Sequence, residues 1–193
     1  MCSLFRNKYR NETCRLIGHD YSLPGKYFIT ICTHQREPYF GNILDGIMIL
    51  SETGRIALNI WYEIPIHFPF VELDEFVVMP NHIHAIIIIE PLSALNVGTL
   101  HATSQRSQQP PQQRSQQQQP FKNEFMSIIS PKFGSLATVI RSYKSAVSKN
   151  AHLTESDFAW QPRFYDHIIR SGMELNRIRK YIIDNPLKWD KQM

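Results

Sequence analysis

"VVMPNHIHAIIII", from Val77 to Ile89, is the stretch of sequence that decides the fold. Its side chains are almost all apolar and many are β-branched, which favours buried strands. The dipeptide Pro80-Asn81 interrupts the run with turn-forming residues. We therefore predict two successive core strands, "FVELDEFVVMP" and "HIHAIIIIE", that pair in an antiparallel manner across a short break.

The sequence before this stretch predicts a strand, a hairpin and a helix. "GKYFITICTH" (25–34) alternates and is rich in strand-forming residues. Asp45-Gly46 stands between apolar flanks, which is the commonest signal of a short hairpin. Ser51 suits the N-cap of a helix that begins with Glu52, and Pro65 is expected to end that helix.

The sequence after it predicts a helix, an extended segment and a second helix. Residues 134–153 carry an apolar stripe at helical spacing, formed by Leu136, Val139, Ile140, Tyr143 and Val147. Residues 158–170 read as an extended segment interrupted by Pro162. Ser171 and Glu174 have the spacing of a capping box, and Asn185-Pro186 is expected to stop the last helix.

A change of composition marks an insert between these halves. Residues 104–120 contain only Gln, Ser, Pro and Arg, which cannot form an apolar core. We interpret residues 93–131 as a flexible, dispensable insert within a single domain that spans residues 1–193.

Composition limits the class of protein. Hydrophobic residues make up 42% of the 193 residues, which is enough for a core. The sequence contains neither an uninterrupted apolar run of membrane-spanning length nor a signal-peptide pattern at its start. Cys2, Cys14 and Cys32 form neither a disulfide framework nor a CxxC site, so the reducing cytoplasm is the expected compartment.

Charge distribution gives a first indication of a partner. The net charge is +4, and residues 134–193 carry ten basic and six acidic side chains. A polyanion such as nucleic acid would bind at such a surface, although ordinary solvated surface explains the same charges.

The two histidines in the central stretch suggest a metal site. Residues i and i+2 of a strand point to the same side, so His82 and His84 lie side by side while Ile83 faces the core. Two neutral imidazoles in this arrangement can bind one metal ion. The alternative is that both are ordinary hydrogen-bonded or exposed histidines. A zinc hydrolase is a weaker reading, because neither HExxH nor a cysteine ligand pattern is present.

Tyr143 is the candidate nucleophile from this reading, because it lies on a basic, amphipathic helix. A tyrosine needs a nearby metal ion, base or cation to react at neutral pH. The alternative is that Tyr143 simply packs, since it belongs to the apolar stripe.

Six blocks resemble the REP-associated tyrosine transposases and related single-tyrosine insertion-sequence transposases, whose HUH motif places two histidines around a hydrophobic residue. Together they span nearly the whole chain apart from the Gln-rich insert. In order they are "DYSLPGKYFITICTHQREPYFG", "LSETGRIA", "VVMPNHIHAII", "VIRSYKSAVSK", "FYDHIIR" and "YIIDNPLKW".

The resemblance implies an α+β fold of the ferredoxin-like or RRM-like type. An antiparallel sheet would carry helices on one face, followed by a C-terminal helical extension. It also implies a DNA transposase that cleaves and rejoins single-stranded, hairpin-containing DNA through a 5′-phosphotyrosine. By analogy His82 and His84 would hold Mg²⁺ or Mn²⁺, and Tyr143 would attack the phosphate. A non-catalytic DNA-hairpin-binding protein of the same fold is the alternative.

The third metal ligand departs from the family pattern. Insertion-sequence relatives often use a glutamine four residues after the tyrosine, and Val147 occupies that position after Tyr143. Asp166 and His167 are the substitutes we consider, alongside a structural role for either. Monomer and homodimer both stay open. The residues expected to bind DNA are Arg141, Lys144, Lys149, Arg177 and Lys180.

Overall fold

The computed structural model describes residues 4–5, 9–10, 19–91 and 134–189. The insert expected at 93–131 lies outside the described residues, and its flexibility and the single-domain assignment stay predictions. The central elements are β3 (Gly25–Cys32), α1 (Glu52–His67), β6 (Val71–Met79), β7 (His82–Ile89), α3 (Leu136–Ala151) and β8 (Tyr165–Ile169). This strand-helix-strand-strand-helix-strand order is that of a ferredoxin-like fold.

Shorter elements and a C-terminal extension complete the described chain. They are β1 (Leu4–Phe5), β2 (Tyr9–Arg10), the 3-10 turn η1 (His34–Arg36), β4 (Gly41–Leu44), β5 (Ile47–Leu50), α4 (Gly172–Ile183) and α5 (Asn185–Lys188). No helix within the described ranges is both long and apolar enough to cross a membrane.

The central sheet has four antiparallel strands in the order β6-β7-β3-β8. The predicted pairing of β6 with β7 is therefore confirmed. β7 lies inside the sheet, where Cys32 of β3 and Met79 of β6 lie opposite His82 on its two sides. All eight residues of β7 are buried, which explains why their sequence shows so little polar alternation.

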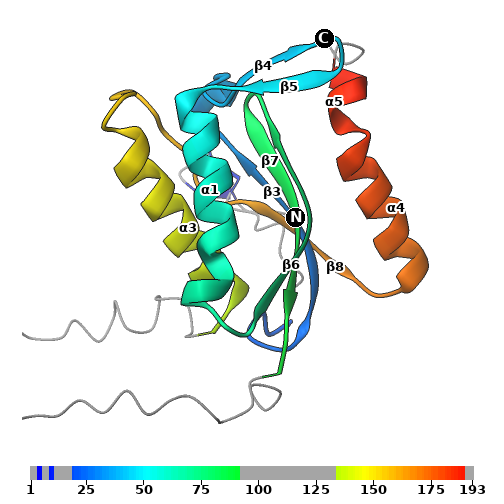
Figure 1. Cartoon of the computed structure of the whole chain (residues 1–193). Coiled ribbons are helices and arrows are strands. Elements are labelled where there is room, and N and C mark those ends of the chain that lie inside the picture. Colours follow the sequence, from blue (N-terminus) through cyan, green and yellow to red (C-terminus); the bar gives the residue numbers. More distant parts are fainter. Residues whose placement is uncertain (1–3, 6–8, 11–18, 92–133, 190–193) are drawn as a thin grey trace, which may run out of the picture.

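Alternate residues of β7 face two different cores. Ile83, Ala85 and Ile87 belong to the main core, which α1 and α3 cover. Ile86 and Ile88 pack with residues of α4 in a smaller core on the opposite face. Figure 1 shows α1 and α3 beside each other on one side of the sheet and α4 on the other. The predicted fold class is confirmed, and the C-terminal extension covers the second face.

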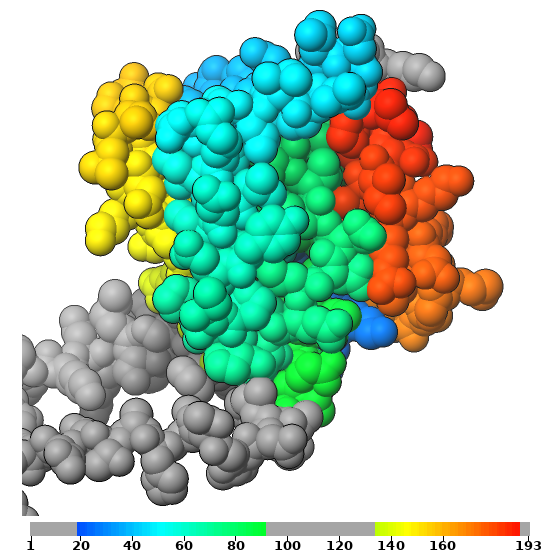
Figure 2. All heavy atoms as spheres, in the orientation of Figure 1, coloured from blue at the N-terminus to red at the C-terminus, as the bar shows by residue number. Residues whose placement is uncertain are grey.

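The main core is built around large aromatic side chains. Trp61 of α1 is completely buried and stacks on Phe76 of β6, with ring centroids 4.6 Å apart. The ring of Tyr143 on α3 meets Trp61 edge-on at 5.2 Å. Burying side chains of this size contributes most of the hydrophobic stabilisation of such a core. In the space-filling view α1 covers the near face, while α4 and α5 lie at the right (Figure 2).

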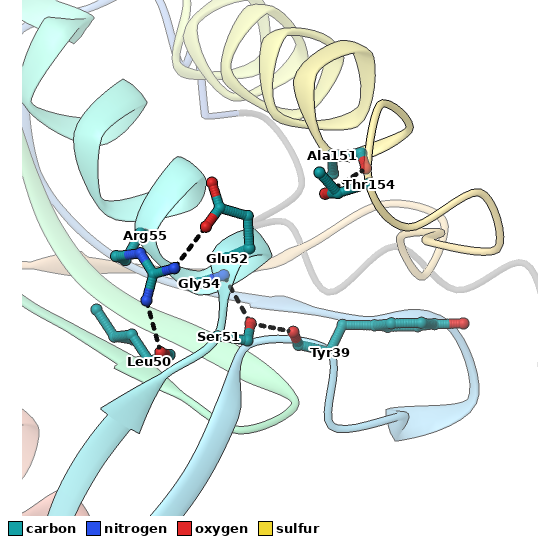
Figure 3. Close-up of polar contacts among 8 residues, drawn as sticks. All are labelled: Tyr39, Leu50, Ser51, Glu52, Gly54, Arg55, Ala151 and Thr154. Carbon is teal, nitrogen blue, oxygen red and sulfur yellow. Dashed lines mark hydrogen bonds and ion pairs between the residues drawn. The ribbon is translucent and has the colours of Figure 1, made fainter.

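Local signals before α1 act as the sequence predicts. Asp45 and Gly46 both have positive φ, at 51° and 75°, as the two-residue turn of a tight hairpin requires. The Ser51 hydroxyl accepts a hydrogen bond from the backbone N–H of Gly54 at 3.0 Å and donates one to the Tyr39 carbonyl at 2.6 Å (Figure 3). This cap joins the loop before the hairpin to the start of α1.

The end of one helix differs from the prediction. α1 continues past Pro65 to His67, so its expected end at the proline is wrong by two residues. A proline keeps helical φ and forgoes only one backbone bond, which the last turn tolerates. α4 ends at Ile183, with Asp184 as its C-cap, so the predicted stop at Asn185-Pro186 is confirmed, although a short helix that was not predicted, α5, begins at Asn185. The predicted N-cap of α4 is confirmed, since the Ser171 hydroxyl accepts from the Glu174 N–H at 3.2 Å.

Candidate functional site

The side chains of His82 and His84 converge at the start of β7. Their Nε2 atoms are 3.1 Å apart, and the residues are only 7% and 6% exposed. The strand therefore points both imidazoles to one side, as the HxH spacing predicts. The helical segments near them on that side are α4 and the end of α5, whereas α3 packs on the other face of the sheet.

Two polar neighbours hold the outer nitrogens of the pair. His82 Nδ1 lies 2.8 Å from the side-chain oxygen of Asn81, and His84 Nδ1 lies 2.8 Å from the hydroxyl of Thr30. Because the Asn81 oxygen can only accept, His82 carries its proton on Nδ1 and has a lone pair on Nε2. Such contacts orient the histidines of metal sites and determine which nitrogen is available to the ion.

The environment keeps both histidines neutral. Burial, the neighbouring His84 and the Arg36 guanidinium lower the pKa of His82 to about 3. Burial and the Arg36 guanidinium lower the pKa of His84 to about 4. Near neutral pH both rings are therefore uncharged and have a lone pair to offer to a cation.

Tyr181 of α4 is the tyrosine that the structure places at the histidine pair. Its Oη atom lies 3.2 Å from His84 Nε2, and the two ring centroids are 5.2 Å apart. The residue is 42% exposed, so the side chain that contacts the histidine is also partly open to solvent. A hydroxyl within hydrogen-bonding distance of a catalytic group is the arrangement that an activated nucleophile requires.

An ion pair fixes the helix that carries Tyr181. Arg179 donates two hydrogen bonds to the carboxylate of Asp74 on β6, from Nε at 2.8 Å and from Nη2 at 2.6 Å. The hydrogen bonds from Arg179 are the main reason why the pKa of Asp74 is lowered from its ordinary value. This two-point contact sets the position of α4 on the sheet two residues before the tyrosine.

Asn185 and Trp189 follow Tyr181 at helical spacing. Trp189 lies over His82, with ring centroids 5.8 Å apart. Asn185 is midway between Tyr181 and Trp189, four residues from each, and is 7% exposed. Asp184, between α4 and α5, keeps helical φ and ψ, so the spacing of four residues puts Asn185 on the same side of the chain as Tyr181 and Trp189.

The loop after β3 brings the positively charged side chain of Arg36 near the histidine pair. Thr33 donates from its N–H and its hydroxyl to the Asn81 carbonyl, at 3.0 and 2.9 Å, which ties η1 to the residue before His82. Gln35 and Arg36 both have positive φ, at 51° and 63°. Two consecutive non-glycine residues in this region store backbone strain, which in proteins is concentrated at functional sites.

Tyr143, the predicted nucleophile, does not reach this site. It is 2% exposed within the main core, and its hydroxyl donates to the Ala57 carbonyl of α1 at 3.0 Å. Burial raises its pKa well above the ordinary value, which opposes formation of a phenolate. α3 covers the face of the sheet opposite to the histidines. The structure therefore does not bring Tyr143 together with His82 and His84, which favours the alternative that Tyr143 packs in the core.

The two substitutes for a third metal ligand are not at the histidine pair. Asp166 lies opposite Ile29 in the sheet and so projects toward the α1 and α3 face. His167 projects toward the α4 face, but its Nε2 lies 2.8 Å from the Glu174 carboxylate at the start of α4. Among the residues that the structure describes, no group of three or more His, Cys, Asp or Glu side chains could hold a metal ion.

The predicted DNA-binding residues fall into two groups. Arg141, Lys144 and Lys149 are on α3, away from the histidine pair. The Lys144 ammonium donates to the carbonyls of Gln161 and Arg163, at 2.8 and 3.0 Å, and burial lowers its pKa to about 8. These contacts favour a structural role for Lys144, and its contact with DNA stays a prediction.

Arg177 and Lys180 are exposed on α4, the helix that carries Tyr181. Of the five residues predicted to bind DNA, these two therefore share a helix with the tyrosine at the histidine pair.

A signal for Tyr181 was present in the sequence. The position four residues after Tyr143 is Val147, which cannot bind a metal ion, whereas the position four residues after Tyr181 is Asn185, which can. The spacing of "YIIDN" thus matches the family pattern better than that of "YKSAV". Arg36 and Thr30, in contrast, have no pattern of their own that would indicate the site.

No family model matches this chain. A protein of Haemophilus influenzae (strain ATCC 51907 / DSM 11121 / KW20 / Rd), described as uncharacterized, is 33% identical over 186 residues, covering 95% of this chain and 92% of that protein.

Two solved structures resemble the fold. One is a REP-associated tyrosine transposase bound to a REP hairpin, with a TM-score of 0.52 and 18% identity, covering 90% of this chain and 74% of that one. The other is a putative transposase from Deinococcus radiodurans R1, with a TM-score of 0.43 and 14% identity, covering 89% of this chain and 98% of that one. The first likeness establishes a shared fold.

Proposed function

We propose that this chain is a single-tyrosine DNA transposase. It belongs to the same protein family as the uncharacterized Haemophilus influenzae protein. Its substrate would be single-stranded DNA that folds into hairpins. The observation that carries the proposal is the 3.2 Å contact between the Tyr181 hydroxyl and the paired imidazole of His84. The fold shared with the transposase bound to a REP hairpin supports the same class of substrate.

Tyr181 is the nucleophile in this proposal. Its oxygen attacks the scissile phosphorus, the bond from phosphorus to the 3′ oxygen breaks, and the phenolic proton reaches the leaving 3′ oxygen through solvent. The 5′ end of the DNA stays attached to Tyr181 as a phosphotyrosine. Attack by a 3′ hydroxyl on this ester reverses the step and joins the strand to a new end. The number of phosphodiester-type bonds is unchanged, so the cycle needs no nucleotide triphosphate.

The residues of the site fit a divalent cation. Adjacent ligands of an octahedral ion, each about 2.1 Å away, are about 3.0 Å apart, and the two histidine nitrogens are 3.1 Å apart. Both imidazoles are neutral, and their outer nitrogens are held by Asn81 and Thr30. We propose that His82 and His84 hold Mg²⁺ or Mn²⁺ with the Asn185 carboxamide as third ligand. When bound, the ion would polarise the scissile phosphate as a Lewis acid.

The charge of Arg36 suits the same reaction. The phosphate is an anion, and it gains charge on the attacking and leaving oxygens during displacement. η1 is tied to Asn81, which places the Arg36 guanidinium where it acts electrostatically on both histidines. We assign to Arg36 the role of contacting the phosphate.

Covalent trapping tests the proposal. The protein is incubated with Mn²⁺ and labelled hairpin DNA that has single-stranded flanks, and SDS-resistant adducts are separated on a gel. We expect an adduct with the unmodified protein, none with Tyr181→Phe, and an adduct with Tyr143→Phe, which removes the corresponding hydroxyl from the core. DNA binding without any adduct would instead support the non-catalytic DNA-hairpin-binding protein. An adduct that survives in Tyr181→Phe would refute the assignment of the nucleophile.

A further inference from the structure

The α4 helix covers the histidine face of the sheet unevenly. Glu174 near its start contacts His167 of β8, whereas Arg179 binds Asp74 on β6, so the helix crosses the sheet diagonally. The first residues of β8 lie beside the path of this helix and not under it. Tyr165 occupies that end and is 45% exposed.

Strand register puts Tyr165 on the same face as the histidine pair. Tyr165 and His84 both lie opposite Thr30 of β3, one on each side of it. Directly opposite residues in antiparallel strands project to the same side of a sheet. Two strand spacings of about 4.8 Å each separate their backbones, so the tyrosine is about 10 Å from the proposed metal ligand.

One ring connects Tyr165 to the proposed catalytic residues. Phe28 is stacked on His84 at 5.4 Å and meets Tyr181 edge-on at 6.1 Å. It also meets Tyr165 edge-on, with centroids 6.3 Å apart. The aromatic cluster thus runs from the buried site to an exposed ring at the sheet edge. Contact with Phe28 restrains the Tyr165 ring, so a ligand that stacks on it orders few additional side-chain rotamers.

We propose that Tyr165 is a stacking site for an unpaired nucleobase next to the scissile phosphate. The inference rests on the proposed function, because it assumes that single-stranded DNA passes Tyr181. An exposed aromatic ring on the face of an antiparallel sheet is the kind of surface on which single-strand-binding proteins stack bases. Stacking tolerates every base, since each has a π-face, so the site would position the strand without choosing its sequence.

Equilibrium binding separates stacking from cleavage. All variants are made in a Tyr181→Phe background and tested without divalent metal ions, so that only binding is measured. The probe is an oligothymidylate of about twelve nucleotides, together with a series in which one position at a time is abasic. Tyr165→Thr removes the π-face and keeps a strand-forming residue. Tyr165→Phe keeps the ring, and Tyr62→Thr removes an aromatic that is 63% exposed on α1, across the sheet.

Tyr165→Thr is expected to bind the oligothymidylate about 5- to 150-fold more weakly, the range that loss of one stacked base predicts. Tyr165→Phe and Tyr62→Thr should bind like the parent. One abasic position should weaken binding to the parent and have no further effect on Tyr165→Thr. Equal affinity of Tyr165→Thr and the parent would overturn the stacking site, even if the covalent adduct forms. A parent protein that binds no single-stranded DNA would overturn the proposed function and the stacking site together.

Discussion

Replacement of Tyr143 by Phe tests whether Tyr143 packs in the core while Tyr181 acts as the nucleophile. The change removes one hydroxyl, which donates to the Ala57 carbonyl at 3.0 Å inside the main core. A buried hydrogen bond of this kind contributes about 0.5–1.5 kcal/mol net. The ring keeps its volume and its edge-on contact with Trp61, so no cavity forms. We expect the free energy of unfolding to fall by about 1 kcal/mol, which lowers Tm by about 2–4 °C in a chain of this size.

Two further variants define the scale of this effect. Tyr143→Ala also leaves a cavity and should cost about 3–5 kcal/mol. Tyr181→Phe removes a half-exposed hydroxyl at the histidine pair and should leave the unfolding curve nearly unchanged. Urea unfolding followed by tryptophan fluorescence reports stability, because Trp61 touches the Tyr143 ring. Adduct formation with hairpin DNA is measured on the same preparations.

We expect opposite outcomes for the two Phe variants. Tyr143→Phe should lose stability and keep the adduct, and Tyr181→Phe should keep stability and lose the adduct. If Tyr143→Phe instead abolished the adduct with an unchanged unfolding curve, the buried residue would be the nucleophile. The packing of α3 against α1 would then have to open during the reaction.

Three other predictions concern the histidine pair and its neighbours. The lowered pKa values of His82 and His84 mean that the unfolded chain binds more protons between pH 6.5 and 4. The free energy of unfolding should therefore fall as pH falls through this window, by at most about 1.4 kcal/mol per pH unit for each histidine. Urea unfolding at several pH values should show that the free energy of unfolding depends less on pH when both histidines are replaced by Gln. Arg36→Gln should slow adduct formation about 100-fold or more, as loss of one phosphate-stabilising donor does in other sites, whereas Arg55→Gln on α1 should not; equal rates would remove Arg36 from the site. Asn185→Ala should raise the Mn²⁺ concentration needed for half-maximal adduct about 10- to 100-fold, and an unchanged titration would exclude Asn185 as a ligand.

Local structure follows from the sequence at particular residues. Asp45-Gly46 supplies the positive φ values of the hairpin, and Ser51 and Ser171 supply hydroxyls to backbone N–H groups at the starts of α1 and α4. These effects involve residues within a few positions of each other, so the chain specifies them without long-range contacts. The convergence of His82 and His84 is of the same kind, because it needs only the two-residue period of a strand.

Which of Tyr143 and Tyr181 lies beside the histidine pair, in contrast, was decided by the tertiary structure. Each tyrosine is on an amphipathic helix with basic neighbours, so local patterns describe both helices in the same terms. What separates them is the face of the sheet on which each helix packs. β7 is buried on both faces, and its sequence carries no polar alternation that would assign one helix to the histidine side. The contact of α1 with α3 and the Arg179–Asp74 ion pair, which join residues far apart in the sequence, place Tyr143 in the core and Tyr181 at His84.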